Sequence, residues 1–443
     1  MNRKYLFLIV LLVISSFFIF YKNTDIISAF PKSGFHVGSF GLILKSEKGN
    51  TIHYTFDSSN PTYMSEEFND YILITGKESY DSLSYIKTTI PDSIGMFPEK
   101  WIEPIEEQDR ATIVKYASFK NGVRVSVVKT LTYFVDDDLT YCDLDNLNNK
   151  KDDTISYNKY KLPVISISTD KINLYSKEKG LFVAGNTFDT DNKHTGNFFE
   201  RGIDFEREVY FQYFDSKGTL EFELNIGMRI HGGVTRRFPQ KSLKFYKRKR
   251  YDKTKVTLPI LADKKVKRFI VEGMQESGGG RALIEDIVAQ EIVKGIGLEQ
   301  QNYQAVIVFI NGEYWGLHTI RDRIDEKYLA YKFNLPKDSF DIIDGHSRHG
   351  YTAIYGKNTD YLNLLDFINK NDLSKEENYQ YISRKIDINN FINYYSVEIF
   401  FANIDWPVHN IKMWKKRNRG KWRFLLYDLD GGFTHNSSKD KIR

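Results

Sequence analysis

The chain has 443 residues, of which 41% are hydrophobic and 15% aromatic, so it can form two or three packed domains and is not a disordered protein. Its formal net charge of +5 is small for this length and does not by itself indicate nucleic-acid binding. The single cysteine, Cys142, excludes an internal disulfide framework and any cysteine-rich metal site.

The N-terminus has the pattern of an export signal. Arg3 and Lys4 precede the apolar run Tyr5–Tyr21, whose length suits either a cleaved signal peptide or a short membrane anchor. Phe17–Phe20 stand where a signal peptidase needs small residues, which favours an uncleaved anchor. We expect residues 1–24 to anchor a single-pass protein in the cell membrane with its bulk outside, secretion being the alternative. A location outside the cell combined with the lack of disulfides indicates a bacterial surface protein.

Residues 38–137 show the period-two alternation of β-strands, with turn residues between the runs. The pattern predicts a small, Ig-like antiparallel β-sandwich. Its alternating runs are Ile52–Phe56, Thr112–Phe119, Val123–Val127 and Leu131–Val135.

The stretch Thr51–Thr62 resembles the module at the C-terminal end of chitobiases and hexosaminidases. It reads Thr-Ile-His-Tyr-Thr-Phe-Asp-Ser-Ser-Asn-Pro-Thr, with Ser58 where that module usually has Gly. The resemblance implies a stalk or spacer domain, or contact with cell-wall glycan through exposed aromatic side chains.

Residues 138–160 form an acidic, Asn-rich segment. A calcium loop starting at Asp143 is excluded, because Leu147 would fall on a ligand position and Asn148 on the turn position that needs Gly. We therefore expect a solvated interdomain linker.

Beyond the linker, alternating segments predict the strands Val164–Ser168, Val209–Tyr213 and Leu220–Leu224. Arg229-Ile-His-Gly232-Gly233 then reads as a strand that runs into a glycine turn. Two glycines allow backbone N–H groups to approach a phosphate closely, although hairpins also use Gly-Gly.

Residues 240–245 read as a strand with Lys241 on one face and Lys244 on the other, so only one of them can point into a nucleotide cleft. A solvated edge strand with protective lysines is the alternative. From Arg229 to Arg268 fifteen Lys and Arg residues face two acids, which predicts a positive face for phosphates, teichoic-type polymers or an anionic membrane. Nucleic acid is the least favoured partner, because no aromatic stacking pattern accompanies the charges.

A helix is predicted over residues 282–293, with acids at Glu285, Asp286 and Glu291 that could pair with the strand lysine or be surface charge. The buried strand Tyr303–Ile310 follows, and Asn311-Gly312 predicts a hairpin turn before Arg321-Asp322.

The last forty residues have a spacing typical of metal chemistry. A predicted helix over residues 386–400 leads to Asp405, and Asn410 follows five residues later. An apolar run then delivers Asp428 and Asp430 to a Gly-Gly turn, and we expect both on one face of a strand. Magnesium with a nucleotide takes oxygen ligands from two separate segments, and protein kinases place D-x-x-x-x-N and a later Asp in this order.

Several motifs in series resemble the CotH kinase family, the spore-coat-type proteins that look like highly diverged protein kinases. The resemblance spans residues 162–433 and implies an α+β chain with a bilobal kinase-like domain over residues 161–443. Because family members usually continue for tens of residues further, the domain is expected to be minimal or truncated at its C-terminus. The matching stretches are Leu162–Ser166, Ile226–Gly233, Pro239–Phe245, Val308–Leu317, Ile386–Ile392 and Asp428–Asp430.

The resemblance implies transfer of the ATP γ-phosphoryl group, with Mg²⁺ or Mn²⁺, to a hydroxyl of a surface or coat protein or polymer. Asp405 takes the position of the catalytic Asp, and Asn410 and Asp428 take the metal-ligand positions, with Asp430 as a second carboxylate. Lys241 is the counterpart of the phosphate-binding lysine.

The remaining expected nucleotide-binding residues are Arg229, Gly232, Gly233, Lys244 as the reserve lysine, Asp286 and Asp322. Asp322 matches the hinge between the lobes, where the family commonly has Glu. A non-catalytic surface or coat assembly protein, using the sandwich and the basic face, is the alternative function.

Overall fold

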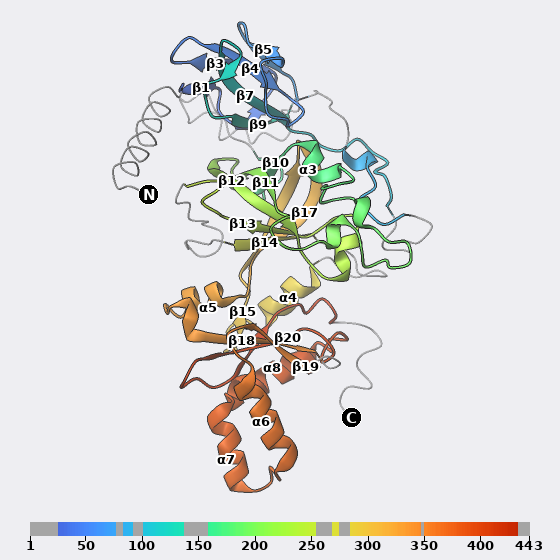
Figure 1. Cartoon of the computed structure of the whole chain (residues 1–443), viewed down its shortest axis with the longest axis vertical. Helices are drawn as coiled ribbons and strands as arrows, with labels where there is room; N and C mark the ends of the chain where they lie inside the picture. The colour runs from blue at the N-terminus through green and yellow to red at the C-terminus, as the bar shows by residue number, and fades with distance from the viewer. Residues whose placement is uncertain are drawn as a thin grey trace, which may run out of the picture. The chain divides into compact units, whose positions relative to one another are not determined.

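The computed structural model describes residues 25–76, 83–91, 101–136, 158–253, 268–273, 284–346 and 350–432 (Figure 1). These residues form an α+β structure, mostly β, with an N-terminal β-sandwich. The predicted anchor, residues 1–24, lies outside this part, in which no helix is long and apolar enough to cross a membrane.

The chain forms two compact units. Unit 1 comprises Met1–Val256, Val271–Gly273 and Ala305–His318, and unit 2 comprises Thr257–Ile270, Met274–Gln304 and Thr319–Arg443.

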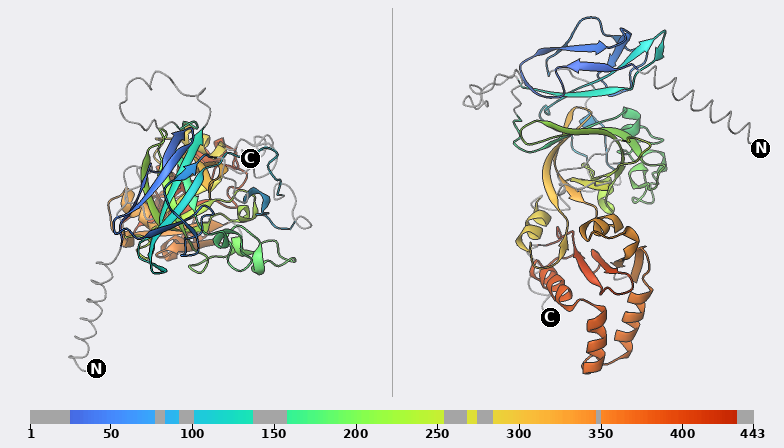
Figure 2. Two further views of the ribbon diagram at one scale, coloured as in Figure 1. Left: turned by 90° about the horizontal axis from the view of Figure 1, so that it is seen from above. Right: turned by 90° about the vertical axis from the view of Figure 1, so that its left-hand side faces the viewer.

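The β-sandwich in unit 1 has two sheets whose apolar faces meet, as the alternation predicted (Figure 2). The first sheet has the order β1 (Ile27–Phe30), β3 (Phe40–Ser46) and β6 (Ile72–Ile74). The second has the order β2 (Gly34–Val37), β9 (Lys129–Asp136), β7 (Thr112–Lys120), β4 (Thr51–Thr55) and β5 (Glu66–Glu67), with β8 (Val123–Arg124) beside β7. The sandwich therefore starts at β1, before the expected boundary at residue 38.

Both faces of β7 are buried, because the second sheet also packs on the next part of unit 1. Phe134 of β9 contacts the rings of Phe214 and Phe309 there. The Thr132 hydroxyl lies 2.5 Å from Oε1 of Gln212, to which it donates. The sandwich and its neighbour thus share a core within unit 1.

That neighbour is a closed barrel, and its strand order gives its topology: β10 (Val164–Ser168), β11 (Arg207–Phe214), β12 (Leu220–Ile230), β13 (Leu243–Tyr246), β14 (Arg268–Gly273), β17 (Glu313–Asp322) and β16 (Tyr303–Ile310). β10 pairs with β16 in parallel and with β11 antiparallel. The boundary between the two units passes through β14, β16 and β17. Beside the strands, unit 1 has the short helix α3 (Lys171–Tyr175) and the 3₁₀ turns η1 (Leu83–Tyr85), η3 (Gly185–Thr187), η4 (Asn197–Phe199) and η5 (Val234–Arg237).

Unit 2 is a five-stranded sheet with helices around it. The sheet has the order β15 (Glu299–Gln300), β21 (Arg423–Leu426), β20 (Ile411–Lys416), β18 (Phe340–His346) and β19 (Gly350–Tyr355). The helices are α4 (Glu285–Ile292), α5 (Glu326–Lys332), α6 (Thr359–Lys370), α7 (Glu376–Lys385) and α8 (Ile388–Phe400), with the turn η7 (Lys337–Ser339). α6 and α7 lie side by side as a hairpin (Figure 2).

Candidate active site

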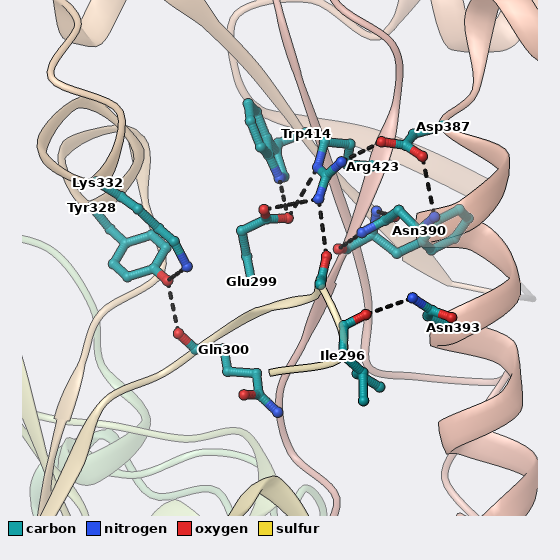
Figure 3. A network of polar contacts seen from close by, with 12 residues as sticks. Ile296, Glu299, Gln300, Tyr328, Lys332, Asp387, Asn390, Asn393, Trp414 and Arg423 are labelled. Carbon is teal, nitrogen blue, oxygen red and sulfur yellow. Dashed lines mark hydrogen bonds and ion pairs between the residues drawn. The ribbon is translucent and has the colours of Figure 1, made fainter. Parts of the chain in front are cut away.

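The strand that leads to Asp428 is held by a network of polar contacts in unit 2 (Figure 3). Arg423 of β21 donates to the half-buried Asp387, which caps the N-terminus of α8, and to Glu299 of β15 at 3.0 Å. Asn390 of α8 accepts from the backbone N–H of Phe424 at 2.6 Å. Helix α8 and strand β21, which lead into the two halves of the predicted motif, are therefore fixed to one another.

The turn after α8 presents Asp405 to solvent. Asn403 is fully buried, and its carboxamide donates to Glu398 at 2.9 Å while its Oδ1 accepts from the backbone N–H of Asp405 at 3.2 Å. The backbone N–H of Ile404 donates to Gly431 at 3.0 Å, and a side chain on Gly431 would collide with Asn403. The exposed Asp405 carboxylate thus stands on a turn fastened to the Asp-Leu-Asp-Gly-Gly segment.

Asn410 and Asp428 meet although eighteen residues separate them. The Asn410 carboxamide nitrogen lies 3.4 Å from the backbone oxygen of Asp428, and Asn403 approaches the same oxygen at 3.4 Å. The structure thus brings together two of the predicted metal-binding residues.

The expectation that Asp428 and Asp430 share a strand face is wrong. Strand β21 ends at Leu426, and Asp428 has a positive φ of 62°, so the backbone changes direction before Asp430. The N–H of Gly432 then closes a turn on the carbonyl of Leu429 at 3.0 Å.

Asp286 is the α4 acid that reaches this segment. Its buried carboxylate accepts from the backbone N–H of Leu429 at 2.6 Å, from Gln290 at 2.9 Å and from the guanidinium of Arg321. The residue directly after Asp428 is therefore clamped to α4, and the cation on Asp286 is Arg321 of β17.

Asp322 ends β17 with a structural contact. Its buried carboxylate accepts from the side chain of Asn302 at 2.7 Å and from the backbone N–H of Asn302 at 3.3 Å. These bonds tie the end of β17 to the segment before β16.

Two residues next to Asp428 were missed by the sequence reasoning. The Lys412 ammonium lies 4.2 Å from the ring centroid of Tyr427. Burial lowers the pKa of Lys412, although the charges of Asp344 and Asp428 oppose the shift. Burial raises the pKa of the Tyr427 hydroxyl far above its ordinary value, and the same two carboxylates add to it. The only signal in the sequence is a lysine two residues after Asn410 in an apolar strand.

The glycine turn of unit 1 is built around a buried arginine. Arg236 donates to the carbonyls of Gly232 at 2.7 Å and Ile230 at 2.9 Å. Gly232 has a φ of 102°, and a side chain there would collide with Thr235, whereas open space surrounds the Cβ position of Gly233. The turn thus requires glycine at position 232, whereas Gly233 is exposed to solvent.

Lys241 is fully buried beneath this turn, just before β13. Its ammonium nitrogen donates to the carbonyls of Arg236 at 2.7 Å and Phe238 at 3.0 Å and lies 4.3 Å from the ring centroid of Phe198. Burial lowers the pKa of Lys241 well below its ordinary value, and the charge of Arg236 adds to it. Lys244 of β13 is half-buried.

Arg229 of β12 forms an ion pair with Glu206, with its Nη2 2.7 Å from a carboxylate oxygen. Its guanidinium carbon also lies 4.6 Å from the ring centroid of Tyr246.

Asn410, Asp428 and Asp430 are of the residue types that bind magnesium or manganese together with phosphate. Among the described residues, no three His, Cys, Asp or Glu side chains form a metal-binding group. Asp428 with Asn410, and Asp430 close by in the chain, supply carboxylate and amide oxygens, and Mg²⁺ bound with a nucleotide typically uses few protein ligands beside water and phosphate.

Comparison with known proteins finds two family models in this chain. Residues 228–442 match the model described as CotH kinase protein, and residues 42–133 match the model described as Fn3 associated. The latter is related in kind to the expected chitobiase-type module, which is not itself named. No curated protein matches the chain. The part of the chain that is similar to the CotH kinase protein model contains every predicted site residue, and the part that is similar to the Fn3-associated model lies before it.

Proposed function

We propose that the part of the chain similar to the CotH kinase protein model is an atypical, metal-dependent kinase that phosphorylates a hydroxyl of a surface or spore-coat protein or polymer. We also propose that the chain is anchored in the membrane with its bulk outside the cell. The observation that carries the proposal is the meeting of Asn410 with Asp428 beside the exposed Asp405. Two separate backbone segments converge there, as phosphoryl transfer with a metal ion requires.

In this mechanism Asp405 accepts the proton of the acceptor hydroxyl as its oxygen forms a bond to the γ-phosphorus of ATP. The bond from that phosphorus to the bridging oxygen breaks, and ADP leaves with the electron pair. Mg²⁺ or Mn²⁺, when bound by Asn410 and Asp428 with Asp430, would neutralise charge on the β- and γ-phosphate oxygens. Asn403 and Asp286 hold the two segments in position.

In unit 1, the backbone of Gly232 and Gly233 is proposed to face phosphate, and Asp322 of unit 2 to mark the hinge. Arg229, which was also expected there, is not included in this site, because Glu206 and the Tyr246 ring hold its guanidinium. Lys241 donates to two backbone carbonyls, which supports a role in shaping the glycine turn. Of the two lysines, we therefore propose the half-buried Lys244 as the one that contacts the nucleotide.

Self-labelling of the full-length protein in detergent with γ-labelled ATP and Mn²⁺ tests the proposal. We use the full chain because a fragment beginning at residue 38 would lack β1 and β2. Asp405→Asn should lower labelling by roughly 10²–10⁴-fold, the usual contribution of a catalytic base. Asp366→Asn, an exposed change on α6, is the control and should label like the parent.

Labelling that is equal in Asp405→Asn and the parent would contradict the assignment of the base. No transfer to any protein or polymer hydroxyl would favour the non-catalytic assembly function.

A further inference from the structure

The barrel of unit 1 holds an arginine cluster on one buried carboxylate. Glu206, just before β11, has a side chain with 0% exposure. It accepts from Arg248 Nε at 2.6 Å, Arg229 Nε at 2.9 Å and Arg250 Nη2 at 3.1 Å, and from the Tyr251 hydroxyl at 3.0 Å. Burial raises the pKa of Glu206, but the bonds from Arg248 and the charge of Arg229 outweigh it and lower the pKa overall.

The fold makes room for this cluster. A Cβ at Gly227 of β12 would lie 2.6 Å from Oε1 of Glu206 and 2.6 Å from Cε2 of Tyr251. Any other residue would push both groups away from the strand, so Gly227 allows the carboxylate and the ring to pack over β12. The convergence of the arginines is therefore a built feature of the barrel.

The cluster carries an excess of positive charge near solvent. Three guanidinium groups share one carboxylate, and the side chains of Arg248 and Arg250 are 36% and 47% exposed. The segment 244–253 contains six Lys or Arg residues and one acid, Asp252. Two neighbouring acids interact electrostatically with single cations of this region: Glu208 with Arg250, and Asp252 with Lys247. They are too few to neutralise its positive charge.

Each guanidinium has five N–H donors, and Glu206 engages only one or two of them on each arginine. Arginines held side by side with remaining donors suit the oxygens of phosphate groups. A bound phosphate would also reduce the repulsion between the guanidinium groups.

The aromatic rings of the cluster are covered by its own cations. The Tyr246 ring has Arg229 at 4.6 Å and Arg248 at 5.1 Å from its centroid, and the Tyr251 ring has Arg250 at 4.4 Å. Nucleic-acid binding of single strands relies on aromatic faces that stack on bases. The cluster is therefore suited to the phosphates of a ligand and not to bases.

The strand beneath the cluster has no edge for a peptide, because β12 is paired with β11 on one side and with β13 on the other. An extended peptide that adds to a sheet needs such an edge. The basic segment continues past the cluster to Lys253, which suits a chain of phosphates better than one isolated group.

We propose that Arg229, Arg248 and Arg250, held on Glu206, form a binding site for a linear phosphate polymer. Binding of the polymer there does not require the phosphotransfer chemistry that is proposed at Asp405. It would hold the protein on a phosphate-rich surface material.

The test uses the full-length protein in detergent and fluorescently labelled long-chain inorganic polyphosphate as the probe. Arg248→Gln with Arg250→Gln should weaken binding at least tenfold at about 0.15 M salt. The slope of log K against log salt should fall by roughly 1.4, if each arginine meets one phosphate. Arg250→Gln alone, at the more exposed position, should give a smaller loss in the same direction and keeps most of the Glu206 contacts.

Arg419→Gln with Lys421→Gln is the matched control, since both residues are exposed and the charge change is equal. Parental affinity in the control supports the site. Parental affinity in the Arg248 and Arg250 variants overturns it.

Three further measurements decide which class of ligand the site binds. Displacement of polyphosphate by low concentrations of Mg²⁺–ATP would show that the cluster belongs to a nucleotide site and would overturn the proposal. Equal affinity for poly-glutamate or for single-stranded DNA would overturn the phosphate-polymer assignment. Polyphosphate binding in a protein that fails to self-label would support this site while the kinase proposal fails, so the two results are separable.

Discussion

Replacing Asp286 with alanine should destabilise unit 2 by about 3–5 kcal/mol, the usual cost of breaking a buried ion pair. Its buried partner Arg321, which also donates to the Thr319 hydroxyl, would lose the carboxylate that neutralises its charge. The backbone N–H of Leu429 would also lose its acceptor at 2.6 Å. These costs overlap, because all arise from one carboxylate.

Two measurements check this prediction. Denaturant unfolding followed by tryptophan fluorescence reports on unit 2 through Trp406, Trp414 and Trp422. Hydrogen exchange in a peptide that covers residues 423–432 reports on the Leu429 amide. Asp366→Asn is the control, and an exposed ion pair of that kind contributes at most about 1 kcal/mol.

A double-mutant cycle isolates the ion pair. Asp286→Ala combined with Arg321→Met should cost less than Asp286→Ala alone, because no buried unpaired charge remains. If Asp286→Ala unfolds like the control and the exchange of residues 423–432 is unchanged, the clamp between α4 and the Asp428 segment is refuted.

Three other substitutions and one measurement on the mature protein have defined outcomes. Asp428→Ala should abolish Mn²⁺-dependent nucleotide binding, measured by calorimetry, while thermal melting stays close to that of the parent, because metal carboxylates rarely stabilise the fold. Lys241→Ala should lower the free energy of unfolding by about 1–3 kcal/mol, since two buried carbonyls lose their donor, and should also slow phosphoryl transfer through the displaced glycine turn. Lys115→Met should stabilise unit 1 at pH 7, with a gain that shrinks between pH 8 and 10 in denaturant titrations. Mass analysis should show that the mature protein keeps Met1–Lys22 and fractionates with membranes.

The sign of the Lys115 effect follows from its burial in β7. Burial lowers the pKa of Lys115 from 10.5 to about 8, although Asp170, Asp57 and Glu208 oppose the shift. Below pH 8 the lysine is charged in both states, so the folded state carries the full desolvation cost, at most about 3 kcal/mol. Between pH 8 and 10.5 the folded state loses the proton first, so stability rises with pH. A gain in Lys115→Met that does not vary with pH would contradict this reasoning.

Strands were the most predictable part of the fold, because a sheet buried on one face leaves alternation in the sequence. The predicted runs appear as β4, β7 and β9, and the turn at Asn311-Gly312 joins β16 to β17. Packing of the sandwich on the barrel was not predictable, because contacts such as that between Thr132 and Gln212 join residues eighty positions apart. No local pattern encodes such a contact.

The part of the candidate site that could be predicted is the set of residues whose types and spacing seldom occur together by chance. Asp405, Asn410 and Asp428 follow a spacing with a chemical reason, and the structure brings Asn410 to Asp428. The residues that hold them were not predictable, since a buried Asn403 or an Arg321 opposite Asp286 depends on tertiary packing alone. A lysine at position 241 reads as a phosphate ligand in sequence, whereas its neighbours in space are backbone carbonyls.

Backbone conformation adds an argument for function that the sequence does not contain. Ala402, Asn410 and Asp428 have positive φ values of 52°, 62° and 62°, a region that L-residues occupy at a cost of about 1 kcal/mol or more. Asn and Asp tolerate it better than Ala, so the alanine shows that the whole turn, and not each side chain, is constrained. Because Asn403 and Asp286 fasten the turn and the Asp428 segment, the fold maintains this strain at the place where Asn410 meets Asp428. The strain is thus retained where the carboxamide nitrogen of Asn410 approaches the backbone oxygen of Asp428. Such strain is expected at a functional site, because a turn with a purely structural role could relieve it by replacing Asn410 or Asp428 with glycine.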